Sequence, residues 1–77
     1  MCRWCVYHTF DSRRSQPGFP DLVLVRTGRL LFVELKSATG KLTAEQEAWL
    51  EALREAGQGE VYCWRPGDWP QIEKALV

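Results

Sequence analysis

The pattern of apolar and polar positions along the first half of the chain predicts three strands. Alternation from Cys5 to Phe10 is typical of a strand. Two runs rich in β-forming residues, 22–26 and 30–36, flank Thr27-Gly28, and together they predict a β-hairpin. Residues 11–18 are polar and rich in turn formers, so we expect a loop between the first strand and the hairpin.

The second half of the chain predicts two helices around a fourth strand. Thr43 and Gln46 form a capping-box pattern, and apolar residues follow at helical spacing as far as Gly57, which favours a left-handed C-terminal conformation. Residues 60–64 predict a strand, and Asp68 is expected to cap a short last helix. The order is βββαβα, an α/β fold. With no repeat or linker, residues 1–77 make a single domain.

Charge adds an asymmetry to this picture. Ten basic and ten acidic residues balance, which excludes a polybasic tail that binds nucleic acid by bulk charge. Residues 1–41 carry seven basic and three acidic groups, whereas residues 42–77 carry three basic and seven acidic groups. We therefore expect a polyanion to meet the first half. No apolar run exceeds four residues, so no membrane span and no membrane partner are expected.

The three cysteines indicate reduced thiols. Their number is odd and no signal peptide precedes them, so we expect a cytoplasmic protein. Cys2 and Cys5 with His8 have part of the spacing of a zinc site, but nothing nearby supplies a convincing fourth ligand. The simpler prediction is a terminal strand with a buried thiol.

The hairpin places two carboxylates face to face. If Thr27-Gly28 is a two-residue turn, Asp21 lies opposite Glu34 on the neighbouring strand. Like charges at such positions repel, and a hard divalent cation removes the repulsion. Lys36 points to the same face, so two acids and one ammonium surround a common point. A Glu-x-Lys pattern alone is usually a solvated strand end, and the whole combination carries the argument.

That combination closely resembles the PD-(D/E)xK nuclease superfamily and, within it, the VRR-NUC (virus-type replication-repair nuclease) family. The resemblance extends from about residue 7 to residue 76. The motifs that carry it are Gly18-Phe-Pro-Asp21, Phe32-Val-Glu-Leu-Lys36, Gly40-x-Leu42, Gln46-x-x-Trp49 and Val61-Tyr-Cys-Trp-Arg-Pro66.

The resemblance implies a restriction-endonuclease-like core and a DNA endonuclease that depends on Mg²⁺ or Mn²⁺ without an organic cofactor. Asp21 and Glu34 match the metal ligands, helped by the main-chain carbonyl of Leu35. Lys36 matches the lysine that orients or activates water or stabilises phosphate charge. Gln46 matches a helix residue lining the active site, although its side chain also fits a purely structural role in the capping box.

The same resemblance implies branched or structured DNA as substrate, in replication, recombination or repair in a bacterial or phage-infected cell. Relatives usually begin with a helix that often carries another acid. Met1 lies just ahead of the first strand, so we expect that helix to be lacking. Both hairpin faces are apolar, and an uncovered face together with the habit of stand-alone relatives predicts a homodimer.

Four further residues are candidates for DNA contacts, each with a structural alternative. They are His8, Arg13, Arg14 and Gly18. The histidine fits a structural role as well as a phosphate contact, the two arginines fit a solvated loop, and the glycine fits a close backbone approach. Trp49, Trp64 and Trp69 are expected in the core rather than stacked on bases.

Two other classes of function stay open at this stage. One is a DNA-binding or assembly subunit that keeps the fold without catalysis. The other is a ribonuclease or toxin, because a phosphodiester site does not name the sugar. Retention of both acids with the lysine favours an enzyme over a binding subunit, because a binding subunit has no need to place two acids together.

Overall fold

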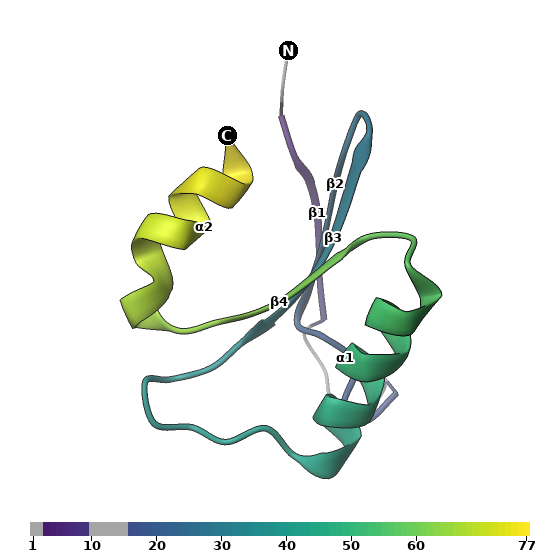
Figure 1. Cartoon of the computed structure of the whole chain (residues 1–77), viewed down its shortest axis with the longest axis vertical. Helices are drawn as coiled ribbons and strands as arrows, with labels where there is room; N and C mark the ends of the chain where they lie inside the picture. The colour runs from purple at the N-terminus through teal and green to yellow at the C-terminus, as the bar shows by residue number, and fades with distance from the viewer. Residues whose placement is uncertain (1–2, 10–15) are drawn as a thin grey trace.

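The computed structural model describes residues 3–9 and 16–77 and has the predicted α/β order. The strands are β1 (Cys5–His8), β2 (Leu22–Arg26), β3 (Arg29–Leu35) and β4 (Glu60–Trp64). The helices are α1 (Ala44–Ala56), the short 3-10 helix η1 (Pro66–Asp68) and α2 (Trp69–Leu76). The strands form one sheet in the order β1-β2-β3-β4, and the two α-helices lie on opposite sides of it (Figure 1). The domain therefore has three layers.

The hairpin register is the predicted one. Arg26 pairs with Arg29 across the Thr27-Gly28 turn, and Gly28 has a positive φ of 80°, which favours glycine at the second central position of a turn. β1 adds to β2 antiparallel, whereas β4 runs parallel to β3 after the crossover through α1. This topology leaves β1 and β4 at the two edges of the sheet.

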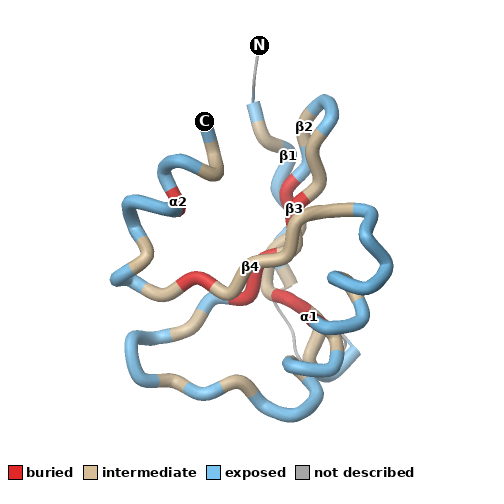
Figure 2. Tube along the Cα trace, in the orientation of Figure 1, coloured by how far each residue is buried: buried red, intermediate tan, exposed pale blue. Residues whose placement is uncertain are grey.

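One face of the sheet packs against α2, and we name it the α2 face. Leu31 and Val33 of β3 are completely buried there, and Leu24 of β2 lies beside them. Trp64 of β4 and Ile72 of α2 close this cluster. The buried stretches in Figure 2 lie in β3, at the end of β4 and at one point of each helix, which places the core on both sides of the sheet's centre.

The opposite face, the α1 face, is covered by α1. Leu50 of α1 is buried. Phe19, in the loop before β2, meets the rings of Phe32 and Trp49 edge to face at centroid distances of 6.3 and 5.1 Å. These aromatic contacts attach the loop before β2 to α1.

The C-terminal end of α2 is held by side chains from the other end of the sheet. Arg29 donates to the carbonyl of Ala75 at 2.6 Å, and the indole of Trp4 donates to the carbonyl of Leu76 at 3.1 Å. A cation is favourable there because the last carbonyls of a helix lack partners and carry partial negative charge. Arg29 also pairs with both carboxylate oxygens of Glu60, at 2.6 and 2.7 Å.

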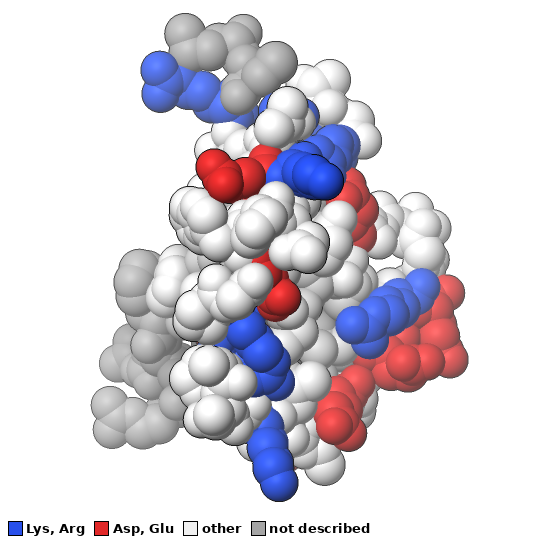
Figure 3. Space-filling model, turned by 60° about the vertical axis from the view of Figure 1, so that its left-hand side comes forward, with Lys and Arg blue, Asp and Glu red and all other residues white. Residues whose placement is uncertain are grey.

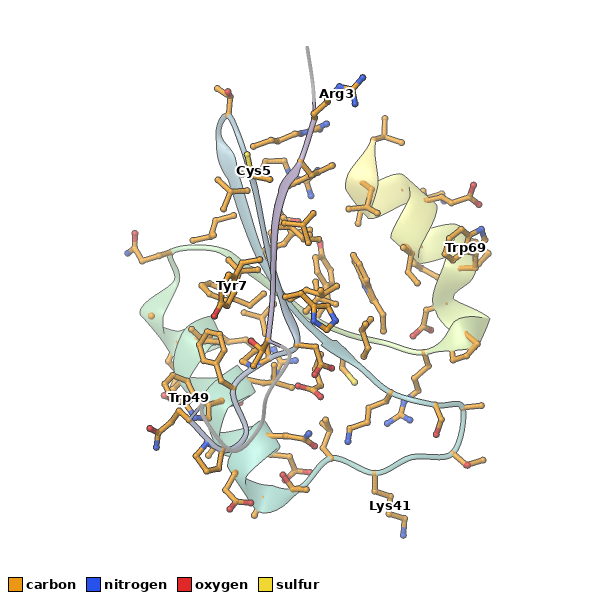
Figure 4. The ribbon with its side chains drawn as sticks, turned by 180° about the vertical axis from the view of Figure 1, so that it is seen from behind. Arg3, Cys5, Tyr7, Lys41, Trp49 and Trp69 are labelled. Atoms are coloured by element: carbon orange, nitrogen blue, oxygen red, sulfur yellow. The ribbon has the colours of Figure 1, made fainter. Side chains whose placement is uncertain are left out.

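Three expectations about individual residues are wrong. The Cys5 thiol is exposed rather than buried, because every residue of the edge strand β1 is exposed. Trp69 is 60% exposed, since it begins α2 on the side away from the sheet (Figure 4). Asp68 precedes α2, but its side chain makes no capping bond to that helix and accepts instead from the Arg65 N–H at 2.9 Å.

Two further expectations are confirmed. Trp64 is buried, and Glu45, Glu47, Glu51 and Glu55 form an exposed face of α1. The first strand, predicted from Cys5 to Phe10, covers only Cys5–His8, and Phe10 lies outside the described residues. None of the described helices is long and apolar enough to cross a membrane.

Candidate active site

Asp21 and Glu34 meet where the hairpin opens. Asp21 directly precedes β2, whose first residue Leu22 pairs with Val33, so Asp21 lies across from Glu34. The Asp21 carboxylate accepts the main-chain N–H of Leu35 at 2.9 Å. The Asp21 carbonyl accepts the N–H of Thr9 at 2.9 Å, which continues the β1–β2 ladder. Asp21 is thus held from both neighbouring strands.

Glu34 is a buried acid with one oxygen in use. The residue is 2% exposed. Its Oε2 accepts the side-chain amide of Gln46 at 3.2 Å. Its Oε1 is buried as well, and it has no hydrogen-bond partner within the part of the chain that the structure describes. A buried carboxylate oxygen without a donor is costly, so this atom is suited to a positively charged ligand.

The surroundings of Glu34 favour its protonated form. Burial, followed by the negative charge of Asp21 and the hydrogen bond that Glu34 can donate to it only when protonated, raises the Glu34 pKa from 4.5 to about 7, against a smaller opposing effect of Lys36. The two carboxylates therefore interact closely, and Lys36 is near enough to act on Glu34. A cation at this point would relieve both the burial and the repulsion.

Gln46 completes the capping box of α1 and also contacts Glu34. Its N–H donates to the Thr43 hydroxyl at 3.1 Å, and its Oε1 accepts the Thr43 N–H at 2.9 Å, which completes the capping box. With Oε1 so engaged, the Nε2 group of the same amide donates to Glu34. The helix cap therefore fixes the amide in the orientation that supports the acid.

Comparison with known families decides what this arrangement belongs to. The VRR-NUC domain profile matches residues 1–64. The chain belongs to the VRR-NUC family. This family assigns it nuclease chemistry in general and a DNA substrate in outline. No curated protein and no solved structure matched the chain.

The matched part of the VRR-NUC domain contains all the strands and α1, whereas η1 and α2 follow it. Every residue of the candidate site described above lies within the match. α2 therefore completes the core of this chain without contributing to the site.

The donor set of the VRR-NUC site fits a hard divalent cation. Asp21 and Glu34 offer carboxylate oxygens, which Mg²⁺ and Mn²⁺ prefer. Among the described residues, no group of three or more His, Cys, Asp and Glu side chains could hold a metal ion. A Mg²⁺ or Mn²⁺ ion at this site would therefore have two side-chain ligands, Asp21 and Glu34. Main-chain oxygen, water or phosphate would complete its coordination.

The predicted DNA contacts are placed only in part. Arg13 and Arg14 lie outside the described residues. His8 is exposed at the end of β1, opposite Leu22. Gly18 has a positive φ of 87°, and a Cβ there would lie 2.6 Å from the Glu45 backbone. The close approach that Gly18 permits is thus one between its loop and α1, and DNA contact at these positions stays a prediction.

Thr9 is a supporting residue that the sequence did not reveal. Its N–H donates to the Asp21 carbonyl, and its hydroxyl is 3.4 Å from the Pro20 carbonyl. The register of β1 on β2, extended by one residue, brings Thr9 and Asp21 together. The loop between the two strands hides that register from the sequence, because its length does not fix how the strands pair.

Proposed function

We propose that this VRR-NUC domain is a metal-dependent DNA endonuclease. The observation that carries the proposal is the buried Glu34, whose Oε1 has no protein donor among the described residues and whose neighbour is a second carboxylate. When no cation is bound, two such carboxylates repel each other and lower the stability of the fold. Uptake of a divalent cation would relieve both the repulsion and the burial of charge.

Asp21, Glu34 and the Leu35 carbonyl would hold Mg²⁺ or Mn²⁺. The bound cation supplies Lewis acidity toward a phosphate oxygen and lowers the pKa of water. Gln46 holds Oε2 of Glu34 and so leaves Oε1 for the cation. Lys36 brings a compact positive charge to the same place, where it stabilises charge on the phosphate or orients the attacking water.

Charge restricts the approach of DNA. Figure 3 shows acidic side chains gathered over one side of the molecule, and the exposed acids Glu45, Glu47, Glu51 and Glu55 of α1 belong there. Phosphates are repelled from that side. The loop between β3 and α1 instead carries Lys36 and Lys41, and the Lys41 side chain points away from the molecule (Figure 4). We infer that the phosphate backbone crosses this loop.

The biological setting that we propose follows from the family resemblance. It is replication, recombination or repair of branched or structured DNA in the cytoplasm of a bacterial or phage-infected cell. The proposed enzyme works as a homodimer that forms at the exposed edge strand of the sheet.

Cleavage of linear, flap and four-way-junction DNA with Mg²⁺ or Mn²⁺ tests the proposal. Lys36→Ala should fold, bind Mn²⁺ and lose about 10²- to 10³-fold in kcat. Asp21→Asn keeps an acceptor for the Leu35 N–H but should lose Mn²⁺ binding by calorimetry and cleavage together. Lys74→Ala removes an exposed charge from α2 and should cleave normally.

The outcomes separate the candidate functions. Equal cleavage by the native chain and Asp21→Asn would overturn the metal role. DNA binding by the native chain without cleavage in either metal would favour the assembly subunit. Cleavage confined to matched RNA substrates would identify a ribonuclease.

A further inference from the structure

Arg65 connects the end of β4 to the loop that follows β3. It directly follows Trp64, the last residue of β4, which pairs with Leu35 at the end of β3. Its guanidinium NH1 donates to the carbonyl of Ser37 at 2.7 Å and to the carbonyl of Gly40 at 2.6 Å. One nitrogen thus joins both ends of a four-residue turn.

The turn has little other support from regular structure. β3 ends at Leu35 and α1 begins at Ala44, so the carbonyls of Ser37 and Gly40 lie between ladder and helix. Within the turn, the Gly40 N–H donates to the Ser37 hydroxyl at 2.9 Å. Bonds from a charged guanidinium to carbonyls are stronger than neutral ones, so Arg65 is a major constraint on this turn.

The Ser37–Gly40 turn lies next to the Lys36 side chain. The Lys36 N–H donates to the Trp64 carbonyl at 3.0 Å, which fixes the residue's backbone. A Cβ at Gly40 would lie 3.6 Å from Cδ of Lys36 and 2.9 Å from the Ser37 hydroxyl. The aliphatic part of Lys36 therefore lies beside Gly40, close enough to touch a side chain added there, and Arg65 holds the Gly40 carbonyl.

We propose that Arg65 is a positioning residue for Lys36. It holds the Ser37–Gly40 turn in one conformation. Because the Lys36 side chain lies beside this turn, the turn fixes the position of the ammonium group relative to Glu34. This proposal rests on the proposed nuclease function. Arg65 belongs to the Val61–Pro66 motif that the chain shares with the family and directly follows the matched residues 1–64, and neither observation assigns it this role.

Kinetics on Arg65→Ala tests the proposal. Misplacement of a catalytic group by about 1 Å can cost up to about 10²-fold, so we expect kcat to fall about 10- to 100-fold with KM and Mn²⁺ affinity unchanged. In a Lys36→Ala background, Arg65→Ala should cost less than about 2-fold, because the group that it positions is gone. Arg65→Lys can bridge both carbonyls with one nitrogen and should recover most of kcat.

Hydrogen exchange tests the clamp, by which we mean the two hydrogen bonds from Arg65 to the Ser37 and Gly40 carbonyls, and it does so independently of cleavage. Arg65→Ala should speed exchange of the Gly40 amide about 10-fold or more, and leave that of Gly57, at the far end of α1, unchanged. Unchanged Gly40 exchange would overturn the clamp, whatever the activity. A raised KM with native kcat, or an undiminished loss in the Lys36→Ala background, would overturn positioning and indicate a phosphate contact. Failure of the native chain to cleave any substrate would overturn the proposed function, while the exchange result still decides the clamp.

Discussion

Glu34 is the residue at which stability and chemistry oppose each other. A buried position beside Asp21 suits an apolar or neutral side chain, and the protein places a carboxyl group there. Protonation is one way to relieve the conflict and a divalent cation is another. The two compete, because a metal ligand must be deprotonated.

This competition predicts how metal-free stability depends on pH. The folded-state pKa of Glu34 is about 7 against 4.5 for an ordinary glutamate, so the stabilisation is complete below pH 4.5 and is lost as pH rises through 7. The difference corresponds to about 3 kcal/mol in the free energy of unfolding. Urea unfolding in EDTA at several pH values measures it.

Two variants and one ligand check the assignment. Glu34→Gln should flatten the pH dependence, and Glu73→Gln, which changes an exposed acid of α2, should keep it. Saturating Mn²⁺ should also restore stability above pH 7. A native chain whose stability rises steadily from pH 5 to 8 without metal would contradict the raised pKa.

At the scale of elements, the loop before β2 and the first turn of α1 depend on each other. Gly18 approaches Glu45 so closely that its positive φ and its missing Cβ are both required. Phe19 then packs against Trp49, and Pro20 is fully buried. This packing sets where Asp21 begins its strand, and α1 in turn carries Gln46 to Glu34.

Gly18→Ala should therefore destabilise the domain by about 2–4 kcal/mol, through left-handed strain and overpacking together. Gly28→Ala is the matched control, because its φ of 80° is equally positive while nothing lies within 4 Å of its Cβ position. That variant should cost about 1–2 kcal/mol from strain alone. Thermal unfolding of both compares them, and equal losses would show that the contact with α1 is unimportant.

At the scale of the whole molecule, the edge strand β1 is the least covered part of the sheet. α1 packs over the β4 side of its face and leaves Tyr7 64% and Val25 42% exposed on the same face. Val6, on the other face of β1, is 59% exposed. Among the described residues, β1 pairs with β2 alone, so its outer edge keeps backbone groups for a further strand.

A second copy of the chain that covers the Tyr7 face would bury this surface. We expect light scattering at micromolar concentration to give twice the 8.9 kDa of one chain. Tyr7→Glu should yield monomers, whereas Val6→Glu, on the opposite face of the same strand, should stay dimeric. A native chain that scatters as a monomer would refute the dimer, and dissociation by Val6→Glu alone would assign the interface to the other face.

Local patterns in the sequence determined most of the fold. The capping box, the Gly57 C-cap and the hairpin turn are contacts between residues close along the chain, so their residue types suffice to predict them. The hairpin register depends on the same turn, and it brought Asp21 opposite Glu34 before any coordinates were known. Asp68 shows the limit of this reasoning, because its side chain accepts the Arg65 N–H in the 3-10 turn and does not cap α2.

Only the tertiary structure decided which contacts hold the acids and the loop beside Lys36. Thr9 on Asp21, Gln46 on Glu34 and Arg65 on the Gly40 turn each join segments separated by a loop or a helix. The length of such a connection does not fix how its ends meet, since that depends on packing throughout the domain. Burial has the same origin. Glu34 and Trp69 acquire their exposure from whether a neighbouring layer covers them, and so the raised pKa of Glu34 is a property of the assembled sheet and helices.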